Sequence, residues 1–280
     1  MFYNSYTECS KGFIMEINNI NSNINNVNQS QNSSLERIST GLKINQAADD
    51  AASLSISDSL RLQRSDLSQS LQNLNQGIAL TRIASDGLDN QQEILGDIRQ
   101  KLLQANTDTT SVDGKEAIKQ EVLKLTEQFQ NIAQTTTFAD QKLITPEATS
   151  TTLDISTADE TFSLDIPNTG QIANELTTLI GATDFGTGDI AAIIDRIDVA
   201  SNQVSSAQSD FGSTENQLAS SARNSITAEV NIAKANSSLT DIDFGKELTD
   251  FSKANILTQI GYLVSTQANA VQEQNVKLLA

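Results

Sequence analysis

The residue types that usually carry out catalysis or bind metals are scarce in this sequence. Histidine is absent and Cys9 is the only cysteine, so neither a disulfide nor a Cys/His metal site can be assembled within one chain. A zinc protease motif of the HExxH type is impossible for the same reason. No nucleophile, base and orienting group can be named, and we therefore predict that the protein is not an enzyme and holds no cofactor or metal.

Carboxylates are plentiful, but their positions do not suggest a catalytic site. Asp49 and Asp50 lie in one segment interpreted as a connector, Asp241 and Asp243 lie in another, and Glu247 begins the last helical segment on a face expected to be polar. We interpret all of them as solvated. The stretch 186–188 lacks the glycine and lysine that complete a phosphate-binding loop, and it is interpreted as a turn.

Composition excludes several classes of partner. The chain has 280 residues and a formal net charge of -17, which argues against nucleic acid and anionic membranes because phosphate contacts need clustered Lys and Arg. No run approaches 18 consecutive apolar residues, so membrane insertion is not expected. The N-terminus also lacks the layout of a cleaved secretory signal.

The longest continuous pattern is an apolar heptad repeat between residues 54 and 106. Its positions are Leu60, Leu67, Leu74, Leu88, Leu95 and Leu102, with Thr81 as the polar exception. A heptad repeat without proline predicts one long helix packed lengthwise on a partner. At about 1.5 Å per residue this helix would span roughly 80 Å, longer than a compact globule of this chain length is wide. We therefore expect a rod.

Two further helices are natural partners for this rod helix. A turn-rich stretch at 106–114 is followed by apolar residues at four-three spacing up to Ile132, which predicts a helix that folds back. The segment 190–236 repeats the heptad with Ile197, Val204, Phe211 and Leu218, and a row of mostly small residues follows three positions on. Large residues facing small ones favour close helix packing. Between these helices, alternating apolar residues predict a β-hairpin near 151–166.

The two ends of the chain carry apolar stripes that need partners. The asparagine-rich segment 15–45 should become helical only when its stripe is docked. The segment 246–280 has apolar residues around more than one stripe, so contacts with other subunits are implied. The predicted assembly residues are Ile20, Ile24, Val27, Leu35, Ile38 and Leu42 at the first end, and Leu248, Ile256, Leu257, Ile260, Val264, Val271 and Leu278 at the second.

These ends closely resemble bacterial flagellins. The N-terminal resemblance rests on Leu35-Glu36-Arg37, Gly41-Leu42-Lys43-Ile44-Asn45 and Ala48-Asp49-Asp50-Ala51-Ala52, and the C-terminal one on Ala254-Asn255-Ile256-Leu257 and Leu278-Leu279. Two departures are Gln272, where many relatives have proline, and Ala280, which replaces a usual basic end. They leave the details of the terminal packing open.

The resemblance implies a mainly α fold: a long coiled-coil rod with a small β-hairpin region and with paired N- and C-terminal helices. The implied parts are an inner terminal domain (15–45 plus 246–280), connectors (46–53 plus 237–245) and a rod (54–168 plus 190–236). A large outer domain is inserted near the middle of many flagellins, and here only a short variable segment at 169–189 remains for it. For residues 1–14 we expect either a non-native leader, with Met15 as the initiator, or a disordered tail.

The resemblance also implies a function and partners. The chain would be a structural subunit that polymerises with itself, possibly mixed with other flagellins, into the extracellular flagellar filament. Its other partners would be hook-associated proteins, cap proteins and an export chaperone, and export would occur without a cleaved signal. Two alternatives remain: a hook-filament junction protein of the same family, and a secreted coiled-coil protein that forms no filament.

One surface departs from the flagellins that an animal innate receptor senses. Arg99 and Glu121 match those relatives, whereas Asp97 stands in place of a positive charge and Lys101 in place of an apolar anchor. Charge reversal and loss of an apolar contact can each cost an interface a few kcal/mol. We therefore expect weak or absent activation of that receptor.

Overall fold

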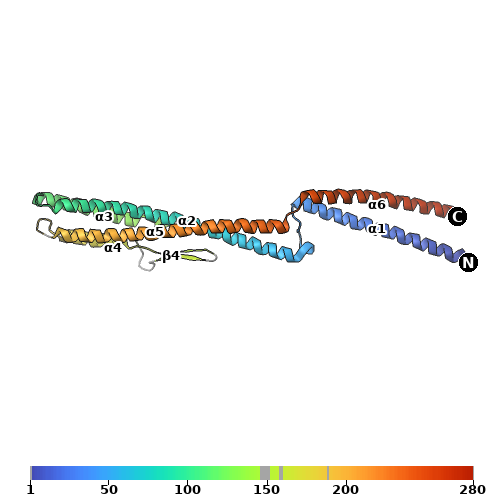
Figure 1. Cartoon of the computed structure of the whole chain (residues 1–280), viewed down its shortest axis with the longest axis horizontal. Coiled ribbons are helices and arrows are strands. Elements are labelled where there is room, and N and C mark those ends of the chain that lie inside the picture. Colours follow the sequence, from blue (N-terminus) through green and yellow to red (C-terminus); the bar gives the residue numbers. More distant parts are fainter. Residues whose placement is uncertain (1, 146–151, 158–159, 188, 280) are drawn as a thin grey trace. The chain divides into compact units, whose positions relative to one another are not determined.

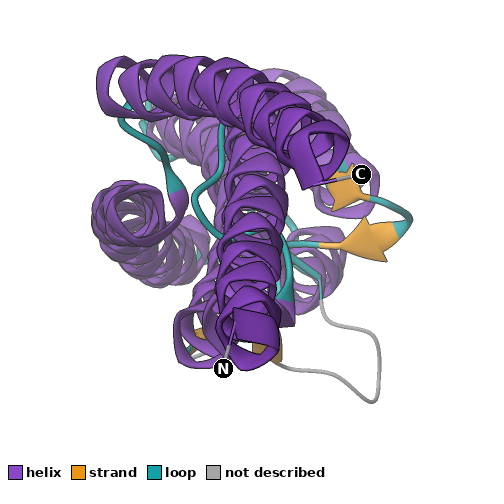
Figure 2. Cartoon of the chain, turned by 90° about the vertical axis from the view of Figure 1, so that its right-hand side faces the viewer, coloured by secondary structure: helices purple, strands orange, loops and turns teal. Residues whose placement is uncertain are grey.

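The computed structural model describes residues 2–145, 152–157, 160–187 and 189–279, and helices dominate them (Figure 2). The helices are α1 (Phe2–Thr40), α2 (Ala47–Ala105), α3 (Val112–Thr135), α4 (Thr169–Ala182), α5 (Ile190–Thr240) and α6 (Phe244–Leu279). Two antiparallel strand pairs are present among the described residues: β1 (Thr137–Phe138) with β2 (Gln141–Lys142), and β3 (Thr152–Ser156) with β4 (Thr161–Asp165). The predicted fold class is confirmed.

The chain divides into two compact units. Unit 1 comprises Met1–Gln63 and Ile232–Ala280, and unit 2 comprises Arg64–Asn231. The boundary falls inside α2 and inside α5, so each of these helices contributes residues to both units.

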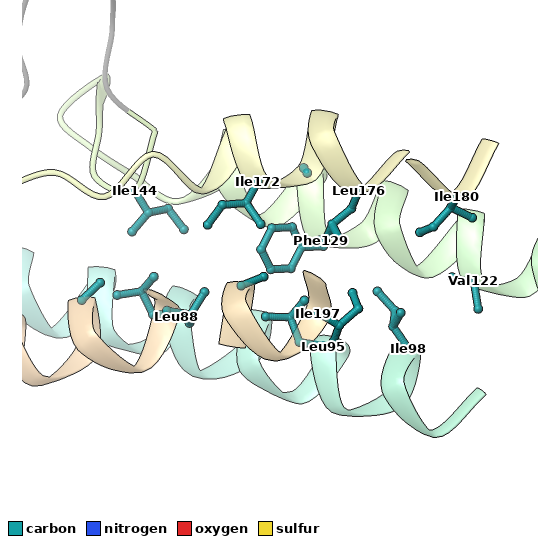
Figure 3. Close-up of a cluster of buried hydrophobic side chains, with 14 of the residues drawn as sticks. Leu88, Leu95, Ile98, Val122, Phe129, Ile144, Ile172, Leu176, Ile180 and Ile197 are labelled. Carbon is teal, nitrogen blue, oxygen red and sulfur yellow. The ribbon is translucent and has the colours of Figure 1, made fainter. Parts of the chain in front are cut away.

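Unit 2 is a helical bundle in which α2, α3, α4 and α5 lie alongside one another (Figure 1). Figure 3 shows Phe129 of α3 at the centre of its core, between the apolar side chains of α4 and those of α2 and α5. The labelled residues around it are Leu88, Leu95, Ile98, Val122, Ile144, Ile172, Leu176, Ile180 and Ile197, all of them buried. Because several helices contribute to it, this core encloses its side chains on all sides.

Helix α4 is a difference from the sequence analysis, which interpreted 169–189 as a short variable segment. Asn168 caps its start by accepting a hydrogen bond from the backbone N of Gln171 at 3.0 Å. At its end, the Nζ of Lys119 donates to the carbonyl oxygens of Gly181 (3.2 Å) and Thr183 (2.9 Å), where a cation complements the helix dipole. With Leu176 and Ile180 fully buried, α4 is part of the core. That 169–189 is a short variable segment stays a prediction.

The hairpin of β3 and β4 lies against α2 and α5. Ile155 packs in a small buried cluster with Leu74 and Leu218, and the Nδ2 of Asn73 donates to the carbonyl oxygen of Ser156 at 2.9 Å. The shorter pair of β1 and β2 was not predicted. Its two-residue turn has positive φ at Ala139 (49°) and Asp140 (65°), a conformation usually signalled by glycine or asparagine, so the sequence carried no turn signal there.

Helix α1 extends further towards the N-terminus than expected, because it begins at Phe2. Residues 2–14 are therefore helical in this structure. The expectation that 1–14 form a non-native leader or a disordered tail stays a prediction.

Two glycines of α2 provide a matched test of the packing in unit 2. A Cβ at Gly87 would lie 2.7 Å from Thr136 Oγ1 and 2.8 Å from its Cγ2, whereas a Cβ at Gly96 would meet nothing within 4 Å. Alanine favours a helix over glycine by about 1 kcal/mol. We expect Gly96→Ala to raise the free energy of unfolding by about 0.5–1 kcal/mol, and Gly87→Ala to lower it by about 1–3 kcal/mol through overpacking. Chemical denaturation followed by circular dichroism measures both, and a Gly87→Ala variant as stable as Gly96→Ala would contradict the close approach.

Candidate assembly surface and its connectors

The terminal helices of unit 1, α1 and α6, lie side by side and antiparallel (Figure 1). Thr258 Oγ1 donates to Asn28 Oδ1 at 3.4 Å, and a Cβ on Gly261 would lie 2.7 Å from Ile24 Cγ1. Gly261 thus permits the helices to approach closely where they meet. The predicted pairing of the terminal helices is confirmed.

The face of α6 that α1 covers is made mostly of small or polar residues. Buried and half-buried positions recur at four-three spacing at Glu247, Phe251, Ala254, Thr258, Gly261, Ser265 and Ala268, and Asn255 beside Ala254 is half-buried as well. Only Phe251 among them is a large apolar residue. The intramolecular seam therefore uses little of the apolar surface that α6 carries.

The large apolar side chains of α6 point to solvent instead. The exposed ones are Phe244, Leu248, Ile256, Leu257, Ile260, Tyr262, Leu263, Val264 and Val271, with exposed fractions from 41% to 67%. Leu35 of α1 is exposed as well, at 54%. So many large apolar residues exposed along one helix indicate an interaction site rather than a random scatter of exposed residues. We call this exposed set the outward face of unit 1.

The other predicted assembly residues lie elsewhere in the pair. Ile24 is buried between the helices, and Ile20, Val27, Ile38 and Leu42 are half-buried. The side chain of Leu278 lies outside what the structure describes. Tyr262 and Leu263 were not among the predicted residues, although the run of apolar residues around Leu263 could have identified it.

The segment 41–43, between α1 and the connector 46–53, is joined by its backbone to residues 240–242 at the second connector. Leu42 and Asp241 form an antiparallel bridge. The backbone N of Lys43 donates to Thr240 O at 2.5 Å, and that of Ile242 donates to Gly41 O at 3.2 Å. Gly41 has φ of +71°, which ends α1 in the left-handed conformation that glycine adopts without strain. We call this pairing the backbone clasp.

The carboxylates of the first connector cap helix starts, a role that the solvated interpretation missed. Asp49 Oδ2 accepts from the backbone N of Asn45 (3.0 Å) and of Gln46 (3.1 Å). Asp50 has extended backbone, with φ of -164°, where α2 is interrupted, and its Oδ1 accepts from the backbone N of Ala52 and of Ser53 at 3.1 and 3.0 Å. The contacts of Asp50 are N-cap contacts to orphan amides where the helix resumes. Asp49, in the first turn of α2, instead reaches back to the amides just before the helix, as the acidic residue of a capping box does.

These hydrogen bonds also lower the pKa of both carboxyls. The pKa of Asp49 falls below its usual value because the amides of Asn45 and Gln46 stabilise the charged form. That of Asp50 falls because the hydroxyl and amide of Ser53 do the same.

The second connector caps α6 in a similar way. Asp243 Oδ1 accepts from the backbone N of Lys246 at 3.1 Å. Glu247, expected on a polar face, is buried with 8% exposure and lies 3.7 Å from Arg37 Nη1 of α1. Since a buried carboxylate needs a partner, this ion pair ties the start of α6 to the end of α1.

The predicted seam of the rod lies partly in each unit. Leu74, Leu88, Leu95, Leu102, Ile197, Val204, Phe211 and Leu218 are buried in unit 2, whereas Leu60 of unit 1 and Leu67 of unit 2 are half-buried. Along unit 2, three arginines of α2 pair with acids of α5: Arg64 with Glu229, Arg82 with Glu215 and Arg99 with Asp198, at 3.2, 2.7 and 2.7 Å. Sequence positions rise on one helix as they fall on the other, so α2 and α5 are antiparallel.

The predicted innate-receptor surface has its charges paired within unit 2. Arg99 Nε lies 2.7 Å from Asp198, and this partner raises the pKa of the guanidinium. Lys101 Nζ lies 2.7 Å from Glu121 of α3, and Asp97 is exposed. Arg99 and Glu121, the two residues that match receptor-sensed relatives, are therefore each engaged by another residue of the same chain.

Within the described part of the chain, no helix is long and apolar enough to cross a membrane.

Comparison with known proteins finds a family and a solved structure that share this architecture. Two family models match the chain: the bacterial flagellin N-terminal helical region at residues 14–149, and the bacterial flagellin C-terminal helical region at residues 194–279. A flagellin of Halalkalibacterium halodurans is 32% identical over 91% of this chain and 93% of its own, and one of Bacillus subtilis is 30% identical over 93% and 94%. A solved structure from Vibrio parahaemolyticus, described as a flagellar hook-associated protein, is 14% identical and covers 69% of this chain and 100% of its own at a TM-score of 0.60, which shows a shared fold.

The hydrogen bonds of Asp49 and Asp50 predict that the stability of unit 1 depends on pH. Because the folded-state pKa of Asp49 and Asp50 is lowered, the stability they contribute is present above the unfolded value of about 4 and is lost as pH falls through the folded value. At pH 7 we expect Asp49→Asn with Asp50→Asn to lower the helix content and thermal midpoint of unit 1, and the difference from wild type to shrink below about pH 4. Asp66→Asn, at an exposed position of α2, is the control and should show no such change. A wild-type difference that persists unchanged at pH 2.5 would contradict the role of charge.

Proposed function

The chain belongs to the bacterial flagellin family, and on that premise we propose that the outward face of unit 1 is the surface through which it polymerises. The family is one of structural proteins rather than enzymes. The chain is a structural subunit of the flagellar filament, which lies outside the cell and is built by self-polymerisation of such subunits.

The observation that carries the proposal is the distribution of apolar residues on α6. The face packed on α1 is largely small or polar, while Ile256, Ile260 and Leu263 are at least half exposed in a single chain. Burying one such side chain fully contributes about 1.5–3 kcal/mol. Several of them per subunit supply a driving force for association that one chain cannot use.

We further propose that different segments of the chain form different parts of the filament wall. Residues 15–45 with 246–280 would form the inner part of the filament wall. Residues 54–168 with 190–236 would form the part around it, with α4 packed into that bundle. The connectors, 46–53 and 237–245, would join these parts, and the backbone clasp would hold the second connector to residues 41–43.

The outward face of unit 1 also suggests which other proteins the chain binds. An export chaperone that covers the apolar side of α6 before secretion would prevent premature polymerisation, and we propose that export occurs without a cleaved signal. Hook-associated and cap proteins would contact the ends of the polymer, and mixed filaments with other flagellins would use the same terminal helices.

The alternative function is that of a hook-filament junction protein, which shares the terminal helices but does not propagate. The fold shared with the protein from Vibrio parahaemolyticus is consistent with either function. Identity of about 30% to flagellins over more than nine-tenths of the chain favours the filament subunit. A secreted coiled coil without a filament would leave the outward face without a partner. Dominance of the protein in sheared filaments would distinguish the filament subunit from both alternatives.

Polar substitution of the outward face tests the proposal. Ile260→Ser with Leu263→Ser removes two exposed apolar side chains without touching the covered seam of α6. We expect the critical concentration for polymerisation to rise at least about tenfold, because each lost contact removes more than about 1 kcal/mol of association energy. Sedimentation of polymer from purified monomer gives the measurement.

The matched control is Val112→Ser, which changes the most exposed large apolar residue of unit 2, at 69%. It should polymerise as wild type does. Polymerisation of the double variant at the wild-type concentration, with its helix content unchanged, would refute the assignment of this face.

We also propose that the chain activates the animal innate receptor weakly or not at all. Asp97 presents the wrong charge and Lys101 is held by Glu121, while Arg99 is held by Asp198. In a cell reporter assay, purified monomer should signal poorly, and Asp97→Arg with Lys101→Leu should increase the signal. Potent signalling by the unmodified monomer would show the proposal to be wrong.

A further inference from the structure

We infer that the side-chain amide of Gln91 is a polar lock that fixes where α4 and the segment 143–145 dock on α2 and α3. Gln91 has 0% exposure and occupies a core position of α2 between Leu88 and Leu95. It is the one departure from apolar character in that part of the seam. Neither the heptad pattern nor membership of a filament-forming family accounts for a buried amide at this place.

The lock is a chain of hydrogen bonds across four segments. Gln91 Nε2 of α2 donates to Phe129 O of α3 at 3.1 Å and to Thr169 Oγ1 of α4 at 3.2 Å. The hydroxyl of Thr169 donates onward to Ile144 O at 2.8 Å, and the backbone N of Thr169 donates to the same oxygen at 3.1 Å. Thr169 is also fully buried.

The orientation of the amide follows from its partners. The carbonyl of Phe129 can only accept, so the amino group of Gln91 must face it. Rotation of the amide by half a turn would place an oxygen against that carbonyl. The donor side of Gln91 is therefore committed to α3 and α4.

A second set of contacts holds the same three partner segments together. Thr145 Oγ1 donates to Ala133 O of α3 at 3.1 Å. A Cβ on Gly170 would lie 2.9 Å from Thr145 Cγ2, so the first turn of α4 lies directly against the segment 143–145. This close contact and the Gln91 bond together constrain where α4 is placed.

The free-energy cost of burying Gln91 indicates that it makes the docking of α4 specific rather than making the protein more stable. Gln91 Oε1 is buried and, among the described residues, has no hydrogen-bond partner. A buried acceptor of this kind is costly, and an apolar side chain of similar shape would avoid the cost. The rest of the α4 contact, through Ile172, Leu176 and Ile180, is apolar and non-directional. The hydrogen bonds select one docking position that the apolar contacts alone leave weakly defined.

The test uses isosteric variants of the intact monomer under conditions that do not polymerise it. Gln91→Met keeps the length and shape of the side chain and removes its hydrogen bonds, and Thr169→Val removes the hydroxyl. We expect amide hydrogen exchange in 169–182 and 143–145 to accelerate about tenfold or more in both variants. Exchange in the part of α5 within unit 2 should not change, because its seam is left intact.

Two further single substitutions and one combination distinguish loss of the Gln91 hydrogen bonds from general damage to the core. Thr126→Val is the matched control, since Thr126 is equally buried but its hydroxyl bonds only to Val122 O of its own helix, at 2.9 Å. Thr169→Ser keeps the hydroxyl and should restore wild-type exchange. Combining Gln91→Met with Thr169→Val should accelerate exchange by less than the product of the two single effects, because the bond between the two side chains is already lost in each.

Unchanged exchange of α4 in both Gln91→Met and Thr169→Val would overturn the inference, as would acceleration spread evenly over unit 2. The result does not depend on polymerisation, so it is separate from the outcome for the outward face of unit 1.

Discussion

The structure depends on how its apolar side chains are divided. Some make contacts within the chain, and others stay on the surface, where another molecule can cover them. In unit 2, α2, α3, α4 and α5 enclose Phe129 and its neighbours from several sides, so the apolar residues find partners in the same chain. In unit 1, α1 is the helix on which α6 packs. A pair of helices buries one stripe on each, and the remaining apolar surface of α6 stays exposed until another molecule covers it.

The small residues of α6 determine which stripe is exposed. Ala254, Gly261 and Ala268 line the side next to α1, and the close contact of Gly261 with Ile24 shows how near the helices come. The larger side chains then have no place in the seam. A protein that must remain soluble as a monomer and still polymerise benefits from this arrangement, because the internal pairing consumes little of the surface needed for assembly.

The sequence predicted the long helices, their pairing and the hairpin, because each follows from a period that a single helix or strand imposes on its apolar residues. Helix α4 was missed, since glycines and polar residues surround a short apolar run and the comparison with larger relatives suggested a variable segment. The roles of Asp49, Asp50 and Gln91 could not be predicted either. Their hydrogen-bond partners depend on where the helix breaks and on segments 38 to 78 residues away in the case of Gln91, and neither leaves a periodic signal.

The backbone clasp has a mechanical consequence. The chain passes between helices twice in unit 1, and the two crossings are joined by the hydrogen bonds between Lys43 and Thr240 and between Ile242 and Gly41. A pull or twist applied to α1 and α6 is therefore shared by two strands in parallel, and neither can stretch without shearing its bonds to the other. A rotating propeller made of such subunits would load this junction at every turn, and a doubled strand resists fatigue there better than a single flexible tether.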